Sequence, residues 1–327
     1  MSMDITFLGT GSAYPSPTRG ASALVVRSEG ECWLFDCGEG TQTQFMKSHL
    51  KAEKKIFIDG YSTTSLGNPF QCFTTLLVKE CFLLSNLDLT HCNLRPLLLV
   101  LSSATTAPIK SLLTLLLTLQ LDPVENSYML VNNQQFVMKA FRLFHRIPSF
   151  GFLVEEKQRT GKLNAQKLKD LGVQPGPIYG KLKNGVTVVL ENGVTISPSD
   201  VLDEPIPGRK ICILGDCSGV VGDGAMKLCY EADLLVHEAT LDDTQVDKAK
   251  EHGHSTPKMA AEFAKLCKVK KLVLTHFSQR YKPAGQVGEG DIDVTELKRQ
   301  AESALNGQGV ILAEDFLTIE IPVKKQK

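Results

Sequence analysis

The sequence lacks several features that define common classes of protein. Its 36 Lys and Arg residues are balanced by 36 Asp and Glu residues, so a polyanion can be bound only through a local basic patch. The nine cysteines include no CxxC pair and follow no disulfide framework, which argues against a zinc knuckle and a disulfide-stapled domain. The opening residues lack the charged and apolar regions of a signal peptide. We therefore expect a reduced, intracellular protein, located in the cytosol or the nucleus.

Nucleotide-binding motifs are also missing. Gly9 and Gly11 follow the first apolar segment, but neither the third glycine of the dinucleotide fingerprint nor a P-loop is present. The composition, 43% hydrophobic and 22% charged, is ordinary for a globular protein and argues against disorder, a collagen-like repeat or a coiled coil. We therefore expect a folded chain of one or two domains without a nucleotide cofactor.

Residues 59–122 differ in composition from the rest of the chain. These 64 residues hold 7 of the 72 charged residues (36 basic and 36 acidic), 19 Leu and 15 Ser or Thr, but two Gly. Their apolar runs keep neither a helical nor a strand period for long. A membrane span needs ~20 mostly apolar residues, and Pro108 and Lys110 interrupt the stretch. An inserted or replaced segment is favoured over membrane insertion.

Elsewhere, short apolar segments of strand length are separated by turn and helix signals. The segments are DITFLG, ASALVV, CWLFD, YMLVNN, QFVMKAFRLF, VTVVL, KICILG, ADLLVH and KLVLTH. YMLVNN and QFVMKAFRLF predict a hairpin with residues 132–133 at its turn. Strands interleaved with helices predict a layered α/β or α+β domain.

Two helices are predicted in the second half of the chain. One begins at Pro257, after Ser255 or Thr256 as its N-cap, because proline is favoured at the first helical position. Its apolar face is expected to contain Met259, Ala260, Phe263, Leu266 and Cys267. The other helix is predicted near residues 292–305.

Four strand candidates end in a histidine or an aspartate. The residues at these ends are His145, Asp216, His237 with Glu238, and His276. Ligands of α/β sheets bind beyond the carboxyl ends of the strands, so these side chains can converge on one spot. A single histidine after a strand is more often a hydrogen-bonded core residue, but four such ends in one chain favour a site. His145, Asp216 and His276 offer the imidazole and carboxylate groups that suit Zn²⁺.

Two further pairs of polar residues have an open interpretation. His252 and His254 lie just before the helix at Pro257 and serve either as surface and capping residues or as a general acid, because imidazole titrates near neutral pH. Asp36 and Glu39 belong to a strand-end turn rich in glycine, where their carboxylates could also support a site.

A basic segment extends over residues 155–185. It holds seven basic residues and one acidic residue, Asp170, between positions 157 and 183. The basic residues are Lys157, Arg159, Lys162, Lys167, Lys169, Lys181 and Lys183. A run of charge is usually a solvated face, but a basic segment hinged by the Pro-Gly-Pro turn at Gly176 also suits contact with a phosphate backbone. We expect this segment to contact nucleic acid.

Several motifs in the correct order resemble those of the ribonuclease Z family, in its short form. They are FLGTGSAYPSPTRG, LFDCGEGTQ, FHRIPSFGF, PGPIYGKLKNG, ILGDCSG, HEAT, EHGHST and LTHFSQRY. The resemblance covers residues 1–58 and about 124–327. It implies a metallo-β-lactamase fold, a four-layer αββα sandwich over residues 1–327 with the basic segment as a projecting arm. It also implies a homodimer that removes the 3′ trailer from precursor tRNA, with two Zn²⁺ ions per subunit.

The resemblance also implies roles for individual residues. His145, Asp216 and His276 match zinc ligands, and His254 and Glu238 match residues that pass a proton to the leaving 3′ oxygen. The residues expected to contact RNA are Arg19, Lys162, Lys167, Lys169, Gly176, Lys181 and Lys183. Arg19 lies with Pro17 and Thr18 in PSPTRG, which departs from the family's PxKxRN and puts the treatment of a CCA end in doubt.

One departure concerns the metal site directly. The family has a Thr-His-x-His-x-Asp-His signature after a strand like KKIFI, whereas here IFI is followed by Asp59-Gly60-Tyr61 and no HxHxDH occurs. We infer that residues 59–123 are a replaced stretch that disrupts the fold locally, and that fewer zinc ions are bound than in the family. The first hypothesis is a zinc-dependent endoribonuclease acting on precursor tRNA. The alternatives are an impaired variant that acts as a tRNA-binding or dimer-partner subunit, and an enzyme with another phosphodiester or a lactone as substrate.

Overall fold

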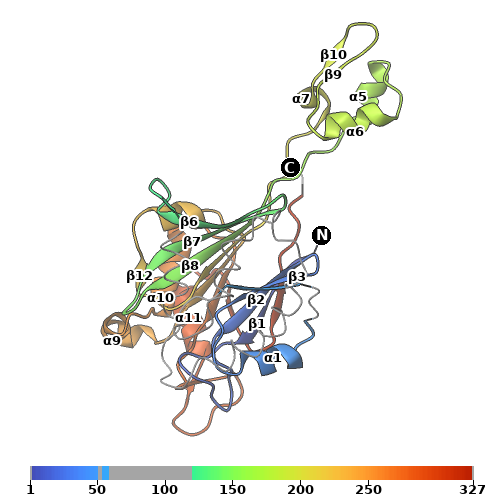
Figure 1. Ribbon diagram of the computed structural model, residues 1–327. Helices are drawn as coiled ribbons and strands as arrows, with labels where there is room; N and C mark the ends of the chain where they lie inside the picture. The colour runs from blue at the N-terminus through green and yellow to red at the C-terminus, as the bar shows by residue number, and fades with distance from the viewer. Residues whose placement is uncertain (1, 51–53, 59–119, 326–327) are drawn as a thin grey trace. The chain divides into compact units, whose positions relative to one another are not determined.

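The computed structural model describes residues 2–50, 54–58 and 120–325, which form two compact units (Figure 1). The first unit contains residues 1–154 and 210–322, and the second contains residues 155–209 and 323–327. The predicted replaced segment, residues 59–123, lies outside the described residues except for residues 120–123. No helix among the described residues is long and apolar enough to cross a membrane.

The first unit contains two large sheets. One sheet has five strands in the order β18-β1-β2-β3-β4, and its neighbours are antiparallel except for the parallel pair β3 and β4. Its strands are β1 (Met3–Gly9), β2 (Ala23–Ser28), β3 (Glu31–Phe35), β4 (Lys54–Ile58) and β18 (Thr318–Glu320). The first three strands correspond to the first three apolar segments of the sequence.

The other sheet has nine strands in the order β17-β14-β13-β11-β8-β7-β6-β5, with β12 beside β7. Its parallel part consists of β11 (Lys210–Leu214), β13 (Leu234–Glu238), β14 (Leu272–Thr275) and β17 (Val310–Leu312). The remaining strands are β5 (Leu121–Asp122), β6 (Ser127–Asn132), β7 (Phe136–Phe144), β8 (Ser149–Glu156) and β12 (Gly219–Val220). The predicted hairpin is confirmed, because β6 and β7 pair in antiparallel fashion, but its turn covers residues 133–135, since Asn132 still pairs with Val137. The Asn133 side chain accepts hydrogen bonds from the backbone N–H groups of Gln135 and Phe136 there.

Alternating side chains place the core between the two sheets. In β11, Ile211 and Ile213 pack toward the five-stranded sheet, whereas Cys212 and Leu214 pack toward the helices on the outer face. In a strand, successive side chains point to opposite faces, so a continuous apolar run marks a strand buried on both sides. Full burial of one large apolar side chain stabilises the fold by ~1.5–3 kcal/mol.

Helices cover the outer faces of both sheets (Figure 1). The helices of the first unit are α1 (Thr41–Lys47), α8 (Gly224–Cys229), the 3₁₀ helix η2 (Asp243–Gln245), α9 (Val246–Glu251), α10 (Pro257–Leu266) and α11 (Thr295–Ala304). A small ladder of β15 (Tyr281–Lys282) and β16 (Ile292–Asp293) precedes α11. The helices predicted at Pro257 and near residues 292–305 correspond to α10 and α11. The four-layer αββα sandwich is thereby confirmed.

One part of the helix prediction is wrong. Leu266, expected on the apolar face of α10, is 61% exposed, and the face that meets the sheet is formed by Ala260, Ala261 and Ala264. Small side chains allow the helix to lie close to the sheet, so the large residue at the end of the helix is left outside.

The second unit has a small core of its own. Its elements are α5 (Ala165–Asp170), α6 (Pro177–Lys183), β9 (Val188–Val189), β10 (Thr195–Ile196) and α7 (Pro198–Val201). Leu168, Val173, Leu182, Ile196 and Val201 are buried together. The basic segment predicted at residues 155–185 lies in this unit, which continues to Arg209.

Candidate metal centre

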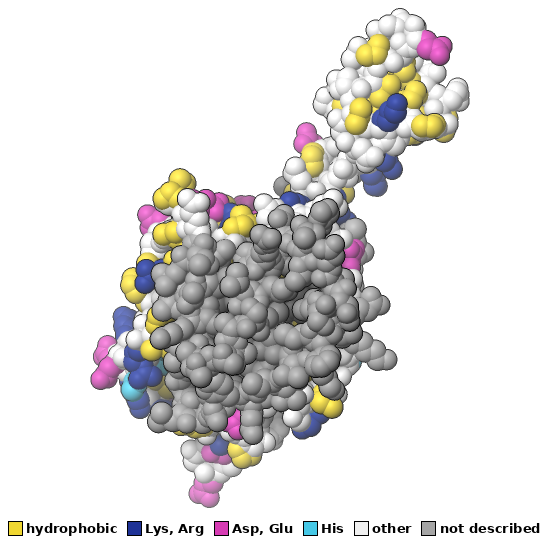
Figure 2. Space-filling view, viewed as in Figure 1, with side chains coloured by type: hydrophobic (Ala, Val, Ile, Leu, Met, Phe, Trp, Pro, Cys, Tyr) yellow, Lys and Arg dark blue, Asp and Glu magenta, His cyan; other side chains and the backbone are white. Residues whose placement is uncertain are grey.

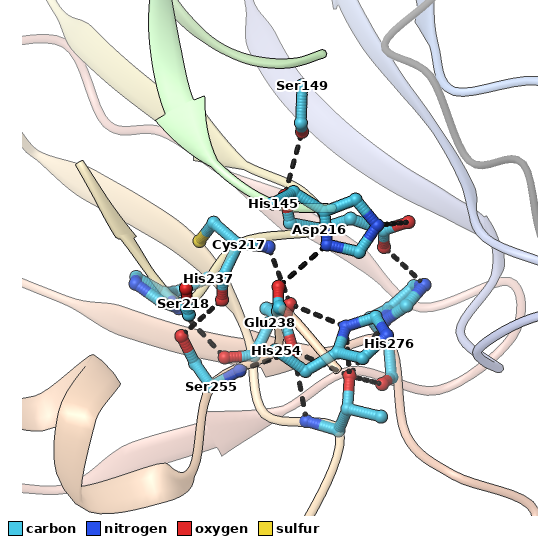
Figure 3. A network of polar contacts seen from close by, with 12 residues as sticks. His145, Ser149, Asp216, Cys217, Ser218, His237, Glu238, His254, Ser255 and His276 are labelled. Atoms are coloured by element: carbon cyan, nitrogen blue, oxygen red, sulfur yellow. Dashed lines mark hydrogen bonds and ion pairs between the residues drawn. The ribbon is translucent and has the colours of Figure 1, made fainter. Parts of the chain in front are cut away.

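The carboxyl ends of three neighbouring parallel strands bring together the side chains predicted from the sequence (Figure 3). Asp216 follows β11, Glu238 ends β13 and His276 follows β14. His145 follows β7, and His254 lies between α9 and α10. The strand-end prediction is therefore met by His145, Asp216, Glu238 and His276. His237 was also predicted at a strand end but lies apart from these groups, with its ring 6.0 Å from that of Phe263 in α10. His254 joins the cluster from the loop before α10 and not from a strand end.

Asp216 and His276 form the centre of the cluster. His276 Nε2 lies 2.7 Å from Asp216 Oδ1, and His145 Nε2 lies 3.9 Å from Asp216 Oδ2. The short contact has the length of a hydrogen bond but not its direction, so within the described structure both carboxylate oxygens and His276 Nε2 lack a hydrogen-bond partner. A buried polar atom without a partner costs ~1–3 kcal/mol. A carboxylate with an imidazole nitrogen beside each of its oxygens offers the donors that zinc takes in proteins.

The electrostatics of this pair favour opposite charges. Burial on its own raises the pKa of Asp216, but the adjacent His276 outweighs it and lowers that pKa to about 2. Burial lowers the pKa of His276, but the Asp216 carboxylate outweighs it and raises that pKa to about 9. Without a cation, a proton on His276 compensates the carboxylate. A metal ion would replace this proton.

The second nitrogen of each histidine is fixed by a neighbouring oxygen. His145 Nδ1 lies 2.7 Å from the carbonyl oxygen of Gly253, and His276 Nδ1 lies 2.9 Å from Thr240 Oγ1. Partners of this kind set the tautomer of an imidazole and direct its other nitrogen to the ligand. The Ser149 hydroxyl donates to the carbonyl oxygen of Asp216 at 2.7 Å and fixes the backbone there. Thr240 and Gly253 were not recognised from the sequence, where only the HEAT and EHGHST motifs mark their positions.

Glu238 is surrounded by hydrogen-bond donors. Its Oε1 accepts from Cys217 N at 2.7 Å, and its Oε2 accepts from Ser255 N at 3.0 Å and from Thr240 Oγ1 at 2.5 Å. The ligand atoms of Asp216, Glu238, His254 and His276 lie within 4.8 Å of one another. Because both Glu238 oxygens are already occupied by donors, this residue is better suited to orient its neighbours than to bind a metal.

The neighbour that Glu238 orients is His254. His254 Nδ1 lies 2.9 Å from Glu238 Oε1, which leaves Nε2 available for proton transfer. Burial raises the pKa of Glu238, and the adjacent His254 lowers it, with a net lowering that keeps the carboxylate charged. This geometry agrees with the pairing of His254 and Glu238 implied by the resemblance.

Other candidate residues lie at the edge of the cluster or outside it. Asp36, in a left-handed backbone conformation with φ of +59°, lines a cavity of about 20 Å³ beside Asp216 and His276, which is room for one water molecule. Glu39 is exposed, and His252 is the C-cap of α9. The cluster therefore receives Asp36 at its edge and neither of the other two.

The residues predicted to contact RNA differ in exposure. Those of the second unit are all exposed and comprise Lys162, Lys167, Lys169, Gly176, Lys181 and Lys183. Figure 2 shows basic side chains of this unit beside uncovered apolar ones. Arg19 is different: only 4% of it is exposed, although Pro17 and Thr18 beside it are exposed.

Comparison with known proteins relates this geometry to a family. A profile of the Beta-lactamase superfamily domain matches residues 197–277, the stretch that holds Asp216, Glu238, His254 and His276. The crystal structure of human tRNase Z, short form, matches with a TM-score of 0.59 and 44% identity, covering 98% of this chain and 100% of that one. The metallo-beta-lactamase fold protein YhfI of Bacillus subtilis matches with a TM-score of 0.58 at 15% identity, which supports the fold alone.

Curated relatives match along nearly the whole chain. Zinc phosphodiesterase ELAC protein 1 of Homo sapiens and that of Bos taurus are each 60% identical over 364 residues, covering 99% of this chain and 100% of the relative. Ribonuclease Z of Synechocystis sp. is 38% identical over 324 residues, covering 98% and 94%. The match of 364 residues is longer than this 327-residue chain, so the human and bovine relatives have residues without a counterpart here. The resemblance seen in the motifs is confirmed: the chain belongs to the ribonuclease Z family of zinc phosphodiesterases, within the beta-lactamase superfamily.

Proposed function

We propose that the chain is a zinc-dependent endoribonuclease that removes the 3′ trailer from precursor tRNA. The observation that carries this proposal is the buried contact between Asp216 and His276, whose facing atoms lack hydrogen-bond partners in the described structure. Such a site, at the carboxyl ends of parallel strands in a member of the ribonuclease Z family, fits a phosphodiesterase that depends on a metal.

His145, Asp216 and His276 would hold the zinc. When bound, zinc acts as a Lewis acid that polarises a phosphoryl oxygen and lowers the pKa of water. The family's HxHxDH signature is missing from the sequence, so fewer than two zinc ions per chain are expected. Two imidazoles and one carboxylate make an open site for a single ion.

His254 would act as the general acid, held by Glu238. Its Nδ1 is engaged with Glu238 Oε1, so only Nε2 remains to donate a proton to the leaving 3′ oxygen. A histidine suits this role because its ordinary pKa lies near neutral pH.

The second unit would bind the tRNA. Its lysines are exposed and displace counterions from the phosphate backbone, which makes such binding depend on salt concentration. In keeping with the family, we propose a homodimer in which this unit of one subunit serves the partner's site, in the cytosol or the nucleus.

Zinc content and cleavage of a precursor tRNA test the proposal on the full chain. The purified protein is expected to retain about one zinc per chain, and Asp216→Asn should remove it. His254→Ala should slow trailer release by ~10²–10⁴-fold, whereas His252→Ala, two positions away and outside the cluster, should leave the rate unchanged.

Two outcomes would contradict the proposal in different ways. Equal cleavage rates for His254→Ala and the unmodified chain would reject His254 as the acid. Binding of precursor tRNA without zinc and without cleavage would leave the alternative role, a tRNA-binding or dimer-partner subunit.

A further inference from the structure

Arg19 is a buried cation at the end of an exposed loop. Its Nη1 donates to Thr10 Oγ1 at 3.0 Å, and its guanidinium carbon lies 4.9 Å from the centre of the Phe277 ring. Only 4% of the residue is exposed, although Pro17 and Thr18 before it face solvent. A guanidinium in this position is poorly placed to meet an RNA phosphate, so its charge serves another purpose.

The hydrogen bonds around Arg19 tie four chain segments together. Thr10 accepts from Arg19 and donates to Asp315 Oδ1 at 2.8 Å, and the Gly20 N–H donates to Asp315 Oδ2 at 2.6 Å. Gln44 Nε2, from α1, donates to the same oxygen at 3.1 Å. The segments after β1 and β17, the middle of α1 and the loop before β2 are thereby held at one point.

Phe277 connects this network to the metal centre. Its N–H donates to the carbonyl oxygen of Thr10 at 2.9 Å, and its carbonyl oxygen accepts from Ser12 N at 2.9 Å. The preceding residue, His276, has a φ of +61°, a left-handed conformation that is unfavourable for a residue with a side chain. Such a conformation persists only where its surroundings hold it.

We infer that Arg19 is a positioning residue for His276. Its guanidinium packs over the Phe277 ring and donates to Thr10, whose carbonyl oxygen accepts from the Phe277 N–H. The residue that follows His276 is thereby fixed from two sides. The imidazole of His276 is then directed at Asp216, as Figure 3 shows. The inference rests on the proposed function only in treating His276 as a zinc ligand. It replaces the RNA contact that the family resemblance implied for Arg19.

Hydrogen exchange of the metal-free chain tests the inference directly. In Arg19→Met, the amides of Ser12 and Phe277 should exchange ~10-fold faster, because a cation–π contact and a hydrogen bond from a charged group are lost. Arg19→Lys keeps the positive charge but loses the planar guanidinium, so it should give a smaller increase in the amide exchange rates. Arg27→Met is the matched control, since Arg27 pairs with Asp4 in the same sheet and does not contact this network.

Unchanged amide exchange at Ser12 and Phe277 in Arg19→Met would reject the inference. An equally large acceleration of amide exchange throughout β13 would also reject it, because Arg19 would then stabilise the whole unit and not the turn at His276. If Arg19→Met does not fold, the comparison of Arg19→Lys with Arg27→Met decides in the same way.

Zinc and tRNA binding separate this inference from the proposed function. Arg19→Met should weaken zinc binding ~10–100-fold and leave the salt dependence of tRNA binding unchanged. A fall of about one in the slope of log K against log salt would show a phosphate contact and overturn the inference. If the unmodified chain binds neither zinc nor tRNA, the proposed function fails, whereas the exchange comparison still decides the position of Arg19.

Discussion

Gly253 shows how a single residue without a side chain sets the position of a ligand. Its φ is +78°, and a Cβ placed on it would lie 2.6 Å from His145 Nδ1. Its carbonyl oxygen is also the partner of that nitrogen, at 2.7 Å. The glycine therefore both approaches the imidazole closely and orients it.

Replacing Gly253 by alanine should displace His145. The left-handed backbone alone costs ~1–2 kcal/mol for a residue with a Cβ, and the contact with Nδ1 adds to that cost. We expect the variant to be less stable and to lose zinc, measured by urea unfolding and by competition with a chromogenic chelator.

Gly172 provides the control for this change. Its φ is +80°, and nothing lies within 4 Å of a Cβ placed there. Gly172→Ala should lose only the backbone part of that stability, ~1–2 kcal/mol, and keep its zinc. Equal zinc affinity of the two variants would show that Gly253 does not position His145.

The sequence predicted the polar residues of the cluster better than the groups that support them. Asp216, His276 and Glu238 follow strands, so a rule about strand ends is sufficient to bring them together. Thr240 and Gly253 act through a hydroxyl and a carbonyl oxygen whose partners are distant in sequence, and no local pattern marks such contacts. The burial of Arg19 was missed for the same reason, because Phe277 and Asp315 lie far along the chain.

At the scale of elements, α10 illustrates the limit of periodicity. Its start at Pro257 follows from local chemistry, since proline suits the first turn of a helix. Its buried face does not follow from hydrophobicity alone, because the sheet beneath accepts alanines and leaves Leu266 outside. The distance between a helix and the sheet beneath it depends on the side chains of the sheet, and the sequence of the helix alone does not give these.

This packing predicts opposite results for two substitutions in α10. Ala264 is 1% exposed and packs in the core between the helix and the nine-stranded sheet. Ala264→Leu should destabilise the chain by ~1–3 kcal/mol, because a close-packed interior has no room for the added volume. Leu266→Ala, at a position 61% exposed, should change stability by less than about 0.5 kcal/mol.

Unfolding in urea, followed by the fluorescence of Trp33, measures both changes. Trp33 is the single tryptophan and is buried between the sheets of the same unit. A destabilised Leu266→Ala or an unaffected Ala264→Leu would show that the helix buries a different face.

At the scale of the whole molecule, the sequence predicted the layers and the basic segment but not the division into units. A layered α/β or α+β domain follows from apolar runs that alternate with helix signals, whereas the four-layer sandwich was implied by the family resemblance. The second unit extends to Arg209, beyond the basic residues that defined the predicted segment, because its core includes Ile196 and Val201. The basic residues therefore indicated the start of the unit, whereas the end of the unit depends on which apolar residues pack into its core.

A buried ion pair joins the two ends of segment 155–209 of the second unit. Arg209 Nε lies 2.9 Å from Glu156 Oε2, and the two residues are 1% and 5% exposed. Burial raises the pKa of Glu156, but its hydrogen bonds with Arg209 outweigh this and lower the pKa below its ordinary value. The folded state thus binds the proton less well than the unfolded state, so the pair stabilises the unit fully above the ordinary glutamate pKa of about 4.3.

Acid should therefore loosen the second unit, and Glu156→Gln should remove this dependence. As pH falls from 6 through the ordinary pKa of glutamate, about 4.3, and on toward the lower folded-state value, the stabilisation is lost. At pH 6, Glu156→Gln should destabilise the unit by ~3 kcal/mol, because the charge facing a buried arginine is gone. Amide exchange at Arg159 and Ile206, which bond to each other at 2.9 Å in both directions, reports the change after correction for intrinsic rates. The variant and the unmodified chain should converge at low pH; a constant difference across this range would show that the Glu156 charge is not responsible.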